Sequence, residues 1–193
     1  MDPILVKKAE LIRDTPLFSQ QDDGESISTE KMNIFLVLAG LKPTGQVNSS
    51  HMEHIPGTNQ YISKPDDAEE IKKFLSELGL EYEMIFDEYF TGAHISLSKD
   101  LLNKQIHKRY DPAHEKEFHK ESGLLYGFPS TAVEAFVNGE TLSPEVQQQL
   151  FKEQGIDPSL DWFFLSKDNY KEEIKTIKKW QDILVQYNLL HSN

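Results

Sequence analysis

The most constraining feature of this sequence is the apolar run at residues 34–38, Ile-Phe-Leu-Val-Leu. It completes a predicted helix over residues 29–38, because Gly40 and Pro43 follow it and such residues are typical of the end of a helix. A helix that is apolar nearly all round is expected to be buried at the centre of a fold. A chain of 193 residues can enclose it, since folding at this size hides about 70% of the surface of the chain.

The rest of the chain has mainly helical patterns. Apolar spacing and helix-end residues predict helices over residues 2–14, 65–78 and 99–107, and others that begin at about residues 112, 130, 144 and 167. Residues 80–86 and 93–97 alternate between polar and apolar, which predicts a β-hairpin. Residues 161–165, Asp-Trp-Phe-Phe-Leu, predict a further strand.

These elements predict an α+β fold. We expect a helix-rich single domain over residues 1–193, with a small antiparallel or mixed sheet. Two polar segments, residues 20–28 and 45–64, are expected to be mobile or irregular loops, because they are rich in residues that interrupt helices and strands.

The chain is acidic, with 20 Lys and Arg against 32 Asp and Glu and a formal net charge of −12. Residues 66–88 alone hold nine acidic and two basic residues. Binding to nucleic acid depends on basic side chains that neutralise phosphates, so this balance argues against a nucleic-acid partner.

Apolar runs in the chain are short. Ile4-Leu5-Val6 near the N-terminus is shorter than the roughly 7–15 apolar residues of a secretory signal. Residues 34–39 form the longest run, far below the roughly 20 residues that a membrane-spanning helix needs. We therefore expect a soluble, cytoplasmic protein that does not bind membranes.

The sequence Leu-Ser-Lys-Asp occurs twice, at residues 97–100 and 165–168, each time before a predicted helix. Ser98 and Ser166 are therefore predicted N-caps. An anion site at each helix N-terminus is the alternative, but the aspartate at each site would repel an anion, so capping is favoured.

With no cysteine in the chain, a metal site would need His with Asp or Glu. His51 and His54 stand three residues apart around Glu53 and are the weak metal candidates, although the Asn, Ser, Pro and Gly residues around them disfavour a helix. His114 and His119 are five apart, which on a helix separates them by roughly 140° and prevents them from binding one ion together. We predict no cofactor.

Residues 123–136 contain several features of turns and helix ends within a short length. Gly123 and Gly127 flank an apolar stretch, and Phe128-Pro129 leads into a helix that Gly139 closes. Thr131 and Glu134, three residues apart, predict a capping box at the start of that helix.

Residues 127–136 resemble a G-[YF]-P-x-x-[CA]-[VI]-x-x-F motif of small, uncharacterised, mostly prokaryotic proteins. The turn Leu41-Lys42-Pro43 is similar to that group as well. Many of its members carry two adjacent cysteines where this chain has Thr131 and Ala132, so the resemblance implies no thiol or metal role here.

A nucleophile elbow, a phosphate-binding P-loop and a dinucleotide-binding glycine motif are all missing from the sequence. We therefore expect a binding or interaction module with a protein or small-molecule partner that the sequence does not identify. The alternative is a small hydrolase or metal-assisted enzyme with a His/Glu site. The site of such an enzyme would combine the His51–His54 loop with His94, His114 or His119. With Tyr126 and Phe128, these last three histidines are the candidate pocket residues.

Overall fold

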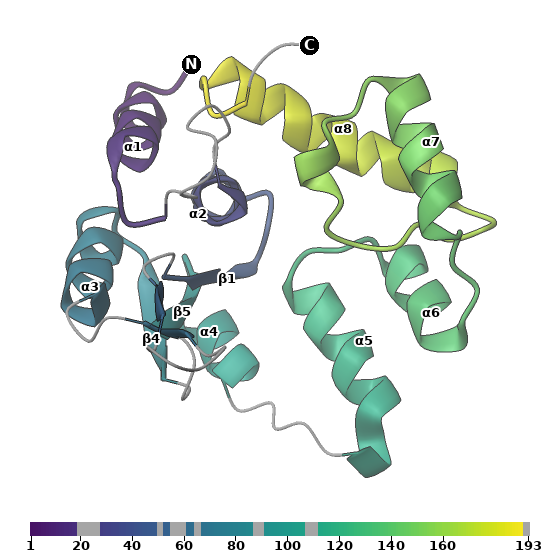
Figure 1. The fold of residues 1–193 in the computed structure, drawn as a ribbon, viewed down its shortest axis with the longest axis horizontal. Helices are drawn as coiled ribbons and strands as arrows, with labels where there is room; N and C mark the ends of the chain where they lie inside the picture. The colour runs from purple at the N-terminus through teal and green to yellow at the C-terminus, as the bar shows by residue number, and fades with distance from the viewer. Residues whose placement is uncertain are drawn as a thin grey trace. The chain divides into compact units, whose positions relative to one another are not determined.

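A computed structural model describes residues 1–18, 28–49, 52–54, 61–63, 67–86, 91–106 and 112–190 (Figure 1). The chain divides into two compact units, residues 1–107 (unit 1) and 108–193 (unit 2), and each is described by itself. Within the described ranges the fold is α+β, with eight α-helices and a small three-stranded antiparallel sheet, as the sequence predicts. The expectation of a single domain stays a prediction, and the expected loop at 20–28 lies outside the described residues except for Ser28.

The sheet of unit 1 contains β1 (Thr44–Asn48), β4 (Glu81–Phe86) and β5 (Thr91–Ser96). Its order is β1-β5-β4, and both pairs are antiparallel. The predicted hairpin is thus confirmed as β4 and β5.

The expectation that residues 45–64 form an irregular loop needs correction, because this stretch includes most of β1. It also contains β2 (Met52–His54), which pairs with β3 (Tyr61–Ser63). β1 shows little strand pattern in sequence, with Val47 as its one aliphatic residue. Tertiary pairing holds it instead: its backbone pairs with β5 along its whole length, and Thr44 and Val47 are fully buried.

The helices of unit 1 are α1 (Pro3–Asp14), α2 (Thr29–Leu38), α3 (Asp67–Glu77) and α4 (Lys99–Ile106). Helices α2, α3 and α4 pack against the sheet. The apolar run of α2 is buried from Ile34 to Leu38, which confirms the expected central position of this helix.

Two lysines stabilise helix C-termini in unit 1. Lys31 Nζ donates a hydrogen bond to the carbonyl oxygen of Arg13 at 2.9 Å, at the end of α1. Lys8 Nζ donates to the carbonyl oxygen of Leu78 at 2.6 Å, just beyond α3. The last carbonyls of a helix lack intrahelical partners, so an ammonium group at this end is favourable.

Unit 2 is helical. Its α-helices are α5 (Glu115–Leu125), α6 (Ser130–Asn138), α7 (Pro144–Gln154) and α8 (Tyr170–Gln186), with short 3₁₀ turns η1 (Pro112–His114) and η2 (Pro158–Leu160). Gly123 allows α5 to approach α6 closely, because a Cβ there would lie 2.8 Å from Val133 Cγ2.

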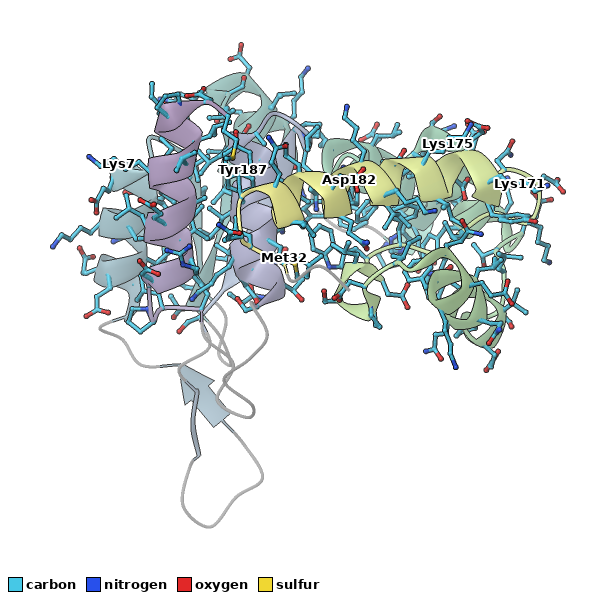
Figure 2. The ribbon with its side chains drawn as sticks, turned by 90° about the horizontal axis from the view of Figure 1, so that it is seen from above. Lys7, Met32, Lys171, Lys175, Asp182 and Tyr187 are labelled. Atoms are coloured by element: carbon cyan, nitrogen blue, oxygen red, sulfur yellow. The ribbon has the colours of Figure 1, made fainter. Side chains whose placement is uncertain are left out.

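Helix α8 is amphipathic, as the sequence predicts. Ile174, Ile177 and Trp180 are buried along one side of it. Lys171 and Lys175, labelled in Figure 2, are exposed near its N-terminal end. Among the described residues, no helix is both long and apolar enough to cross a membrane.

The predicted strand at residues 161–165 is wrong, because a side chain takes the hydrogen bonds that a neighbouring strand would make. Gln147 on α7 is buried; its Oε1 accepts from the backbone N–H of Leu165 at 2.7 Å, and its Nε2 donates to the carbonyl oxygen of Phe163 at 3.0 Å. The same Nε2 donates to the carboxylate of Asp161. The segment is therefore irregular, and one isolated bridge joins Ser166 to Thr141.

The predicted capping box of α6 is also wrong. Pro129 occupies the N-cap position, so Thr131 lies within the first turn and its hydroxyl is free to bond elsewhere. It donates to Glu173 Oε1 at 2.6 Å, while Glu134 forms an ion pair with Lys120 at 3.1 Å. Ser98 does accept the expected N-cap hydrogen bond, from the backbone N–H of Leu101 at 3.4 Å. The predicted N-cap at Ser166 is wrong: Ser166 accepts from the Asn169 N–H at 2.9 Å, but α8 begins only at Tyr170 and Asn169 occupies its N-cap position.

Candidate binding surface

An exposed aromatic cluster lies on the surface of unit 2. Phe136 on α6 and Phe164, in the irregular segment before α8, stack with ring centroids 5.8 Å apart and planes 8° from parallel. Their exposed fractions are 45% and 43%, so both rings present large areas to solvent. Together with His119 they form what we call the aromatic face.

His119 on α5 completes this face from the side. Its ring meets Phe136 in an edge-to-face contact, with centroids 5.6 Å apart and planes at 84°. A second edge contact joins it to Phe118, and its Nε2 lies 3.6 Å from Glu115 Oε1. Contacts on two sides therefore hold the imidazole of His119 against Phe136.

Phe164 is held outward by its buried neighbour. Phe163 is buried, and its ring centroid lies 5.2 Å from that of Phe128 and 6.0 Å from that of Trp180. Because Gln147 binds the backbone of both Phe163 and Leu165, the backbone on each side of Phe164 is fixed. The exposure of Phe164 is thus built into the fold of unit 2.

A buried carboxylate joins the two segments that carry the aromatic rings. Glu173 on α8 is 1% exposed. Its Oε1 accepts from Thr131 Oγ1 at 2.6 Å and from Ser166 Oγ at 2.7 Å, and its Oε2 accepts from the Ser166 N–H at 2.7 Å. These bonds offset the cost of burying a carboxylate and connect α6, which carries Phe136, to the segment that follows Phe164.

The structure places the predicted pocket residues in both units. Tyr126 and Phe128 are half-buried, and their ring centroids lie 6.1 Å apart. The ring of Phe128 also contacts the ring of the buried Phe163. His119 belongs to the aromatic face, and His114 is exposed at the end of η1. His94 lies in unit 1.

His94 lies at the centre of the unit 1 sheet, between Gln46 on β1 and Glu83 on β4. It is half-buried, and its Nδ1 is buried without a hydrogen-bond partner in the part of the chain that the structure describes. Burial lowers the pKa of His94, and the carboxylate of Glu83 opposes that shift. A neutral imidazole is therefore favoured at this position.

The weak metal candidates stay untested, because His51 and the side chain of His54 lie outside the described residues. Elsewhere in the described ranges, no three His, Asp or Glu side chains gather closely enough to hold a metal ion.

Phe136 and Phe164 are surface residues that the sequence patterns do not identify as such. Phe136 ends the motif at residues 127–136, which gives no sign that this side chain is exposed. The adjacent Phe163 and Phe164 did carry a signal, since neighbouring side chains in an extended segment point to opposite sides and only one of the two can face the core.

Comparisons with protein-family models, with curated proteins and with solved structures found no match to this chain. The resemblance of residues 127–136 to an uncharacterised family therefore stays a prediction.

Proposed function

We propose that this chain is a binding protein whose aromatic face docks an apolar segment of a partner protein. The observation that carries the proposal is the stacked pair Phe136 and Phe164, which unit 2 fixes in place with more than two fifths of each side chain exposed.

Aromatic side chains with restricted motion suit this role. They contribute large apolar areas at binding surfaces, and a side chain already held in its bound position loses little entropy on binding. The buried contacts of Phe163 and Glu173 hold the segments that carry the two rings. We expect a partner segment with an aromatic or proline ring, because such rings pack on flat ring faces.

Selection from a random peptide library on the immobilised protein tests the proposal. We expect the selected peptides to be rich in aromatic residues and proline. A Phe136→Ser/Phe164→Ser variant should weaken their binding by at least about 30-fold, the usual effect of losing a central aromatic contact.

Val146→Ser is the matched control, because Val146 is equally exposed but lies on α7. It should leave the affinities unchanged. Equal losses in both variants, or no loss in the phenylalanine variant, would contradict the proposal.

A further inference from the structure

Unit 1 has an open sheet edge that the proposed function does not use. In the order β1-β5-β4, β4 is an outer strand, and within the described residues it pairs with β5 alone. The pairing with β5 runs over all six residues of β4, from Glu81 to Phe86. Among the described residues of unit 1, the opposite edge of β4 therefore has no strand paired with it.

The charge on β4 indicates which kind of strand could pair with its free edge. Glu81 and Glu83 are exposed and stand two residues apart, so both carboxylates lie on the same face of the sheet. The strand has no basic residue, and it belongs to the acidic stretch at residues 66–88. Directly opposite side chains on paired strands lie about 5 Å apart, so a partner with Lys or Arg at alternate positions would meet both carboxylates.

The other face of β4 is apolar. Tyr82, Met84 and Phe86 alternate with the two glutamates; the first two are half-buried, and Phe86 is 67% exposed. A strand added at this edge would extend the apolar face beside Met84 and Phe86. The edge therefore matches a segment that alternates basic and apolar residues.

We propose that the free edge of β4 binds an extended, basic segment of a partner protein as an additional strand. Main-chain hydrogen bonds to β4 provide affinity in this mode, and alternate side chains provide specificity. Glu81 and Glu83 select a basic segment, and they also disfavour pairing with a second copy of β4, since exposed charges on edge strands oppose self-association.

A synthetic peptide of about nine residues, with Lys alternating with Val, is the probe. We expect it to bind the intact chain in fluorescence anisotropy and to perturb the backbone amide resonances of Glu81–Phe86. A peptide of the same composition without the alternation should bind at least about tenfold more weakly. Absence of binding, or equal binding of the two peptides, would overturn the proposal.

The double variant Glu81→Lys/Glu83→Lys should reduce the affinity at least about tenfold. Glu10→Lys/Glu117→Lys changes the net charge equally at two exposed sites on other elements, α1 and α5, and is the control. An equal loss in both variants would mean that only overall charge attracts the peptide, and the proposal would fail.

N-methylated peptides test the main-chain hydrogen bonds without any change to the protein. Successive N–H groups along an added strand point alternately toward β4 and away from it. Methylation of one alternate set should therefore abolish binding, and methylation of the other set should leave it intact. If both sets are tolerated, or if addition of peptide only drives the chain to self-associate, strand addition is wrong.

Discussion

Thr131 on α6 donates a hydrogen bond to Glu173 on α8 across 2.6 Å, although 42 positions separate the two residues in the chain. The same Oε1 accepts from Ser166, so one buried carboxylate connects three segments of unit 2. Replacement by Glu173→Ala leaves these donors without their acceptor, and we expect a loss of about 2–4 kcal/mol in the free energy of unfolding. Urea denaturation measures it.

Glu172→Ala is the control for that experiment, because Glu172 is the exposed neighbour on the same helix. It should change the free energy of unfolding by less than about 0.5 kcal/mol. A similar effect of the two substitutions would show that the hydrogen bonds of Glu173 contribute little to stability.

Gln147 supplies the second buried polar anchor of unit 2. Gln147→Leu removes the partners of the Leu165 N–H and the Phe163 carbonyl, and we expect destabilisation by about 2–4 kcal/mol. Gln148→Leu, at an exposed position of α7, should be nearly neutral. Thermal unfolding of the two variants distinguishes them. Equal melting temperatures would contradict the claim that the hydrogen bonds of Gln147 stabilise unit 2.

Lys42 makes the stability of unit 1 depend on pH. Its side chain is buried and donates to Asn33 Oδ1 at 2.6 Å, and Asn33 Nδ2 in turn donates to the carbonyl oxygen of Gln46 on β1 at 2.8 Å. Burial lowers the pKa of Lys42 from 10.5 to about 7. Between these two pH values the unfolded chain binds a proton at Lys42 that the folded chain does not. The free energy of unfolding therefore rises with pH across this window, and below it the full cost of burying the charged amine is present.

The comparison of the wild type with Lys42→Met isolates this effect. From about pH 7 to pH 10 the wild type should gain stability relative to the variant, by at most about 1.4 kcal/mol per pH unit. Parallel curves of unfolding free energy against pH would show that the buried amine keeps its ordinary pKa.

Gly92 on β5 is a position where a methyl group does not fit. A Cβ there would lie 2.5 Å from the carbonyl oxygen of Val47 and 2.8 Å from Asn48 Oδ1, against β1. Gly92→Ala should therefore destabilise the sheet by about 3 kcal/mol. At Gly45 the nearest atoms would be 3.2 Å away, so Gly45→Ala should cost less, and the reverse order of melting temperatures would contradict this packing.

The elements with strong local signals were predictable from sequence. The apolar run of α2 requires burial whatever surrounds it, and Ser143 and Gly155 define α7 by capping, with Gly155 in the left-handed conformation. β1 had no comparable signal, because pairing with β5 holds a stretch of weak strand propensity.

The errors at residues 161–165 and at Thr131 both involve a buried side chain on another helix. Gln147 takes hydrogen bonds that a neighbouring strand would have made, and Glu173 accepts from the hydroxyl of Thr131, which the N-cap at Pro129 leaves within the first turn of α6. Local patterns do not contain such partners. The aromatic face was only partly predictable for the same reason. His119 was predicted as a site residue, but Phe136 and Phe164 stack across 28 positions of the chain, and no local pattern contains such a contact.

The most direct test of the proposed binding function places 4-fluorophenylalanine at position 164 and follows its fluorine resonance while a selected peptide is added. A second label at Phe151, which is buried on α7, reports on the core of unit 2. The account predicts a saturable shift at position 164, with the same dissociation constant as the binding assay, and no shift at position 151. A peptide that saturates the protein while the resonance at position 164 stays in place would contradict it.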